Sequence, residues 1–149
     1  MEINIFEPMP LVYAAQSKYF FFCRDAVCEF VLKEGAVPLH PFRIFDYFLD
    51  DRVDRDLIRR ANNNIVSRAD EVWVFGDVIA NGVLFEIDLA YTTGRLVKFF
   101  TIATKASKIH SIATGQISFE QELIALANGD IAALKAVLVG DRRLHEVLN

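Results

Sequence analysis

One carboxylate in this sequence has both the position and the surroundings that catalytic chemistry needs. Glu86 follows Asn81 and Gly82 by about one helical turn, in a segment that is otherwise apolar. A glycine at a helix start lets a ligand approach the backbone, and the free N–H groups of the first turn favour negative charge. A carboxylate on an apolar face is costly unless it is paired or has a chemical role. Glu86 is therefore the candidate reactive group, with Asn81 and Gly82 as ligand contacts; a favourable interaction with the helix dipole is the structural alternative.

Further polar side chains follow two short apolar runs, 10–15 and 36–39, that are typical of buried strands. In a parallel sheet the carboxyl ends of the strands meet at one edge, where ligands bind. We therefore expect these residues to face a ligand, although a solvated loop and a structural histidine explain them equally simply. The candidate binding residues are Gln16, Ser17, Lys18 and His40.

Strands and helices alternate through the first two thirds of the chain. The expected strands are 10–15, 36–39, 71–75 and 96–102, and the expected helices are 19–33, 53–68 and 82–93. Gly35 and Gly94 each follow a helical pattern and are typical stop signals. Helices of this length between strands form βαβ units. The sequence predicts an α/β fold with a doubly wound parallel sheet that carries helices on both faces.

The remaining segments are predicted to be loops and helices around that core. Residues 42–51 are aromatic and irregular, which indicates a short helix or a flap, and 76–81 should be a loop. The tail, about 105–149, is predicted to be a helical appendage to a core of about 10–102 within one domain. A capping box at 118–121 should open one helix, with Asn128 and Gly129 ending it and Asp130 capping the next.

Composition excludes several classes of function. Of the 149 residues, 53% are hydrophobic and 24% are charged, which fits a folded domain rather than a disordered one. The net charge of −4 and the lack of a basic segment argue against binding to a nucleic-acid polymer. No apolar run reaches the roughly 18 residues that span a bilayer, so no membrane partner is expected. Thirteen phenylalanines suit either a core or a subunit interface.

Cysteine and histidine spacing predicts neither a disulfide nor a metal site. Cys23 and Cys28 lie five residues apart in a predicted helix, match no zinc spacing and are expected to be free thiols in the cytoplasm. The three histidines fall in separate segments. The glycines form neither a dinucleotide nor a P-loop fingerprint, so no cofactor is expected.

Several motifs between residue 10 and about residue 102 together resemble one enzyme family. They are VYAAQSK after the first strand, IVSRAD (65–70) before the strand EVWVF, GVxxEIxxA (82–90), and GRLV (94–97). In combination they resemble the nucleoside 2-deoxyribosyltransferases and the related nucleoside 5′-monophosphate N-glycosidases. The resemblance covers about two thirds of the chain. It implies a Rossmann- or flavodoxin-like fold and a nucleoside or nucleotide substrate.

The resemblance assigns roles to individual residues. Glu86 matches the nucleophile that attacks the anomeric carbon through an oxocarbenium-like transition state. Asn62 stands where relatives have an aspartate that orients or protonates, and Ala80 stands where they have Asp or Ser. Ser17 and Lys18 match a loop that holds phosphate in the monophosphate-hydrolysing relatives. Relatives assemble as dimers or larger homo-oligomers, so a homo-oligomer is expected here.

Two other classes of function stay open at this point. Because an asparagine donates a hydrogen bond but delivers no proton, Asn62 and Ala80 also suit a nucleotide-binding module without turnover. In the third alternative, an assembly protein, Glu86 only completes a helix terminus. A nucleotide stabilises the binding module without release of base, and it leaves the assembly protein unaffected.

Overall fold

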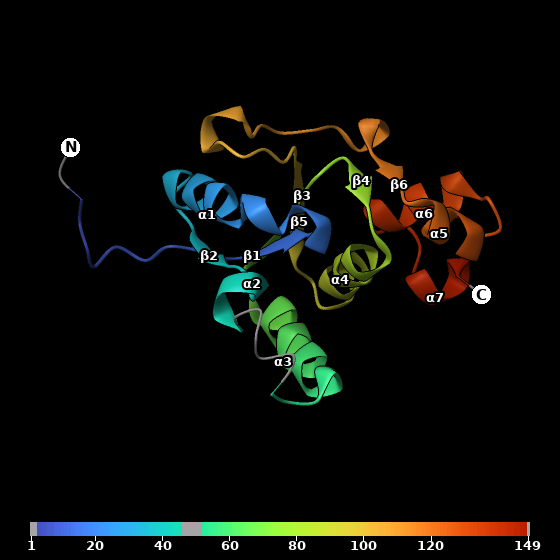
Figure 1. Cartoon of the computed structure of the whole chain (residues 1–149), viewed down its shortest axis with the longest axis horizontal. Helices are drawn as coiled ribbons and strands as arrows, with labels where there is room; N and C mark the ends of the chain where they lie inside the picture. The colour runs from blue at the N-terminus through green and yellow to red at the C-terminus, as the bar shows by residue number, and fades with distance from the viewer. Residues whose placement is uncertain (1–2, 46–51, 149) are drawn as a thin grey trace.

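Four parallel strands form the central sheet of the computed structural model, which describes residues 3–45 and 52–148 (Figure 1). The spatial order is β2-β1-β3-β5. The strands are β1 (Leu11–Gln16), β2 (Val37–Leu39), β3 (Glu71–Phe75) and β5 (Leu96–Phe100). The predicted parallel α/β sheet is confirmed. The fourth strand ends before residue 102, because the N–H of Thr101 bonds instead to the carbonyl of His110 at 2.8 Å.

The two faces of this sheet carry separate hydrophobic cores. Successive strand residues point to opposite faces, so Val12 and Ala14 face one core while Tyr13 and Ala15 face the other. Helix α1 (Arg24–Lys33) packs on the first face. Helices α3 (Arg55–Arg68) and α4 (Asn81–Thr92) pack on the second. The helices that carry the candidate residues Asn62 and Glu86 therefore share a face with Tyr13.

The helix expected over 19–33 is divided in two, so that prediction is wrong in part. A 3-10 helix η1 (Lys18–Cys23) precedes α1, and Phe20 has non-helical dihedrals of −105° and 26°. The side-chain amide of Gln16 donates to the carbonyl of Phe20 at 2.9 Å. That carbonyl would accept from Arg24 in a continuous α-helix, but Arg24 bonds to Phe21 instead. The other two helices lie as predicted, with Asp54 capping α3.

The expected loop at 76–81 contains a strand, and the expected capping box is wrong. β4 (Val78–Ile79) pairs in parallel with β6 (Ser118–Phe119) in a second sheet. Ser118 is therefore a strand residue, and Glu120 is the N-cap of α5 (Gln121–Leu126), without a side-chain cap hydrogen bond. Burial decides this arrangement, because Ile79 and Phe119 both enter the core shared with α4.

The tail does more than cover the surface. It continues through α6 (Ile131–Leu138) and α7 (Leu144–Val147), beside α4 (Figure 1). Leu123, Leu134 and Val137 are fully buried in the core that also holds α4. The predicted cap is confirmed, since Asp130 accepts from the N–H of Ala133 at 3.1 Å. The expected helical appendage is thus corrected to an integral part of one core.

Short elements complete the described chain. They are α2 (Pro41–Ile44), η3 (Ala106–Lys108) and η4 (Thr114–Gln116). The first falls in the predicted helix or flap at 42–51, whose residues 46–51 lie outside the described part. Both cysteines are free thiols, as expected. Among the helices of residues 3–45 and 52–148, none is long and apolar enough to cross a membrane.

Docking of the tail on α4 gives a first prediction. Gly140 has φ +80°, and a Cβ there would lie 2.8 Å from Cδ1 of Tyr91. The Tyr91 ring is held in place because its hydroxyl donates to the carbonyl of Leu138 at 2.7 Å. Gly140→Ala should therefore lower the free energy of unfolding by roughly 1–2 kcal/mol for the backbone and a further 1–3 kcal/mol for the clash. Gly35→Ala, with φ +87° and no neighbour within 4 Å, should show only the first cost. Equal losses for the two variants in urea unfolding would contradict the clash.

Candidate functional site

Three polar side chains from three different elements meet on the α3/α4 face of the sheet. The hydroxyl of Tyr13 on β1 donates to Oε2 of Glu86 on α4. The amide Nδ2 of Asn62 on α3 donates to the Tyr13 hydroxyl oxygen at 2.7 Å and lies 3.1 Å from the same Glu86 oxygen. The sequence predicts that Asn62 and Glu86 share a site, and the structure brings them into hydrogen-bond contact.

Local structure explains why these three residues converge. Tyr13 belongs to the alternate set of β1 residues that faces α3 and α4, and it is only 1% exposed. Asn62 lies one helical turn before Val66, which is fully buried against the same core. Glu86 lies next to Ile87 and one turn after Val83, both buried. The apolar faces of the two helices therefore carry the amide and the carboxylate to the sheet.

Burial sets the protonation of this cluster. It raises the pKa of Glu86 from 4.5 to about 7, although the hydrogen bonds from Tyr13 and Asn62 oppose the shift. Burial and the charge of Glu86 raise the pKa of Tyr13 well above 10. Tyr13 therefore keeps its proton and donates a hydrogen bond to Glu86. The carboxyl group titrates near neutral pH, which is the range that acid–base and nucleophilic catalysis use.

Two oxygens of the cluster have no hydrogen-bond partner in the described part of the chain. Both protein donors contact Oε2 of Glu86, and no hydrogen bond reaches Oε1. The amide oxygen Oδ1 of Asn62 is buried and also lacks a partner. An unsatisfied buried acceptor costs roughly 1–3 kcal/mol, so each one in a folded protein calls for an explanation, such as a catalytic role or an ordered water molecule. The cluster thus bonds one carboxylate oxygen to two protein donors and leaves the other without a donor among the described residues.

Gln16 and His40 form a second polar cluster, on the opposite face of β1. The N–H of Phe42 donates to Nδ1 of His40 at 3.2 Å, so Nε2 carries the ring proton and donates to Oε1 of Gln16 at 2.8 Å. Burial and two nearby arginine charges lower the pKa of His40 to about 4, which keeps the ring neutral. These bonds join the ends of β1 and β2 to η1 and α2. Both ring nitrogens are satisfied within the protein.

The other predicted binding residues lie at the same sheet edge or at the start of α4. Ser17 is buried, and its Oγ accepts from the N–H of Tyr19 at 3.3 Å. Lys18 is exposed, with Nζ 5.9 Å from the centre of the Tyr19 ring. Asn81 and Gly82 are exposed in the first turn of α4. No described side-chain hydrogen bond joins these four residues to the carboxyl group of Glu86.

Tyr13 is the member of the site that sequence reasoning missed. It lies in an apolar run that predicts a buried strand and no polar role. The available signal was its hydroxyl, because a buried tyrosine needs a hydrogen-bond partner. The sequence alone could not name that partner, since Asn62 and Glu86 lie 49 and 73 residues away.

For metals, the described histidines, cysteines and carboxylates form no group of three that could hold an ion.

Comparison with known proteins places this site inside a defined family. Residues 13–100 match the family described as a domain of unknown function, DUF7768. The match covers 88 of the 149 residues, so the chain belongs to this family. It begins at Tyr13 and includes Asn62 and Glu86. No curated protein matches the sequence.

The raised pKa of Glu86 predicts a specific dependence of stability on pH. Folded Glu86 binds its proton up to about pH 7, whereas the unfolded chain releases it near 4.5. The unfolding free energy that this group contributes is therefore fully present below pH 4.5 and is lost as the pH rises through 7. Glu86→Gln keeps the hydrogen-bond acceptor and avoids the buried charge. It should match wild type near pH 4.5 and be more stable at pH 8, by up to roughly 3 kcal/mol.

Thermal unfolding from pH 4.5 to pH 8 checks this expectation. Glu34→Gln, at an exposed glutamate beyond α1, is the matched control and should show no such divergence. A Glu86→Gln melting temperature that runs parallel to wild type across the range would show that Glu86 is ordinarily ionised.

Proposed function

We propose that this protein cleaves, or transfers a group across, the N-glycosidic bond of a nucleoside or nucleotide, with Glu86 as the nucleophile. The observation that supports this proposal is the hydrogen-bonded cluster of Tyr13, Asn62 and Glu86. It presents one carboxylate from a largely apolar setting, fixes one of its oxygens and leaves the other unbonded. The sequence resemblance assigns the same glutamate to attack on the anomeric carbon.

The cluster suits a two-step reaction with retention. Oε1 of Glu86 attacks the anomeric carbon as the C–N bond breaks, and the bond electrons leave with the base. Water or a second base then attacks the glycosyl ester and releases the carboxylate. Tyr13 and Asn62 hold Oε2 throughout, so that charge returning to the carboxylate in the second step meets donors already in place.

Strand order supports a ligand crevice beside this cluster. In the order β2-β1-β3-β5 the chain proceeds from β1 outward on one side and then crosses to β3 on the other. Doubly wound folds bind ligands where the strand order reverses, outside the carboxyl ends of the strands. We assign the sheet to this Rossmann-like class. Tyr13 on β1 and Glu86 after β3 then flank the reversal.

Free Cys23 and Cys28 accord with a cytoplasmic location for the protein.

A second candidate function is nucleotide binding without turnover. Asn62 and Ala80 favour it, because neither side chain delivers a proton to a departing base. Tyr13 does not replace them, since its proton is bonded to Glu86 and its pKa is raised. A binder of this kind is stabilised by nucleotides in a thermal-shift assay and releases no base.

Assays of base release test the glycosidic proposal. Wild type incubated with deoxynucleosides and their monophosphates should release free base, and Glu86→Gln should reduce the rate by at least 100-fold. Because the nucleophile must be ionised, kcat/KM should rise with pH to a plateau above an apparent pKa of about 7. Equal rates for wild type and Glu86→Gln would remove Glu86 from the mechanism. Nucleotide stabilisation without release of base would favour the binding module.

Asn62 generates a separate prediction about the leaving group. Wild type should prefer N-glycosides whose base departs neutral without a proton, such as a pyridinium riboside, over purine deoxynucleosides. In Asn62→Asp the new carboxyl lies beside Glu86, which favours its protonated form, so it can donate to a purine. The purine-to-pyridinium ratio of kcat/KM should rise at least tenfold. Asn63→Asp, one residue along the same helix, is the control, and an unchanged ratio in Asn62→Asp would refute an acid role at this position.

A further inference from the structure

The chain begins with an arm of apolar side chains that lacks a core of its own. Residues 3–10 precede β1 and run away from the body of the molecule (Figure 1). Ile3 and Ile5 are each 81% exposed and Phe6 is 87% exposed. Side chains of this kind gain free energy when they leave water, and a cluster of them on a surface marks an interaction site.

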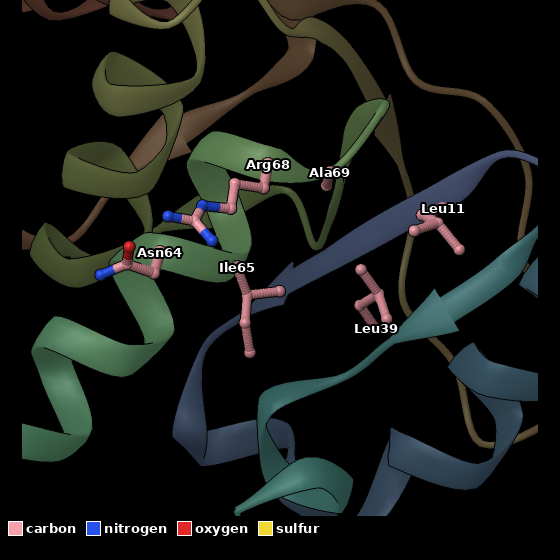
Figure 2. A pocket seen from close by; sticks show the side chains of 6 residues that line it. All are labelled: Leu11, Leu39, Asn64, Ile65, Arg68 and Ala69. Atoms are coloured by element: carbon pink, nitrogen blue, oxygen red, sulfur yellow. The ribbon is translucent and has the colours of Figure 1, made fainter.

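A mainly apolar hollow lies near the root of this arm and could receive apolar side chains like those of the arm. It has a volume of about 280 Å³ (Figure 2). The lining residues are Leu11, Leu39, Asn64, Ile65, Arg68 and Ala69. The strand leucines face Ile65 of α3 across it, and its walls are mainly apolar (Figure 2). Small-molecule sites occupy roughly 300–1,000 Å³, so this smaller hollow suits one or two protein side chains.

The arm contains one hydrogen-bonded turn and is fixed at its root. The N–H of Glu7 donates to the carbonyl of Asn4 at 3.1 Å, and the N–H of Phe6 donates to Oδ1 of Asn4 at 3.0 Å. Pro8 and Pro10 restrict the φ angles of the segment that follows this turn. The carbonyl of Pro10 accepts from the N–H of Val37 at 2.9 Å, which fixes the root of the arm to β2. The arm is therefore anchored at its base, and its exposed side chains lie away from the body of the molecule, where a second molecule can reach them (Figure 1).

We propose that the arm of one copy docks in the Leu11–Leu39–Ile65 hollow of a second copy. The arm of the second copy docks in the same hollow of the first. Because the hollow begins at Leu11, directly after the arm, two copies related by a twofold axis form both contacts at once. Phe6 and its isoleucine neighbours supply the apolar side chains.

Charge complementarity supports a second copy as the occupant. Glu7 lies within the arm and Arg68 borders the hollow, and neither forms an ion pair within residues 3–45 and 52–148. Arm exchange brings these opposite charges to the same contact. Ile65 lies one turn from Asn62 on α3, so the docked arm packs on the helix that carries the site amide. The exchange itself does not depend on the proposed activity.

Sedimentation of the full chain at micromolar concentrations tests the exchange. Wild type should be dimeric, and Phe6→Asp should raise the dimer dissociation constant at least tenfold. Phe22→Asp, at another exposed phenylalanine outside arm and hollow, should leave it unchanged. Glu7→Arg and Arg68→Glu should each weaken the dimer, and the double variant should recover it. A monomeric wild type, or a Phe6→Asp variant as dimeric as wild type, would overturn the proposal.

Chain mixing shows whether the contact crosses between molecules. Two chains that differ in mass through their tags are mixed, one with Phe6→Cys and the other with Ile65→Cys. Both also carry Cys23→Ala and Cys28→Ala, which removes the native thiols. They should form a mixed disulfide under mild oxidation. Circular dichroism of each variant verifies folding before the measurement. A third chain carries both Phe6→Cys and Ile65→Cys. If this chain forms a disulfide within itself while the two single-cysteine chains form none between them, arm exchange is refuted.

Discussion

The candidate site depends on one carboxylate whose desolvation is only partly offset by hydrogen bonds. Glu86 is carried to the sheet by a helix face whose other members are apolar, and it finds two donors there, Tyr13 and Asn62. These donors lower its pKa, yet desolvation outweighs them and leaves the value near 7. A group held in this state contributes less to folding than an apolar residue of the same size. Stability alone therefore does not account for a carboxylate at this position, in agreement with the nucleophilic role proposed above.

The fold supplies this environment through the two-residue period of a single strand. Adjacent β1 residues face different cores, so Tyr13 joins α3 and α4 while Gln16 joins His40 on the other side. Three residues of strand rise by about 10 Å, which separates the Glu86 cluster from the His40 cluster. The tail packs behind α4, where Leu134 and Val137 share its core. The helix that carries the carboxylate is thereby packed on both sides.

The two polar clusters differ in whether their polar atoms all have hydrogen-bond partners. In the His40 cluster every ring nitrogen has a partner, which suits a fixed joint between strand ends. In the Glu86 cluster the amide oxygen of Asn62 has no partner among residues 3–45 and 52–148. Structural networks are stable when all their groups are bonded. Sites that must accept a substrate keep part of their bonding capacity open.

The sequence by itself determined the four parallel strands, α3 and α4, and it singled out Glu86 and Asn62 as candidate site residues, because periodicity, glycine stops and local motifs are properties of neighbouring residues. Only the tertiary structure decided that Tyr13 completes the cluster, that Gln16 and His40 lie on the other face, and that Ser118 is a strand residue rather than a cap. Each of these depends on a contact between segments more than 20 residues apart. The energy that selects such contacts comes from burial in a shared core, which no local pattern encodes.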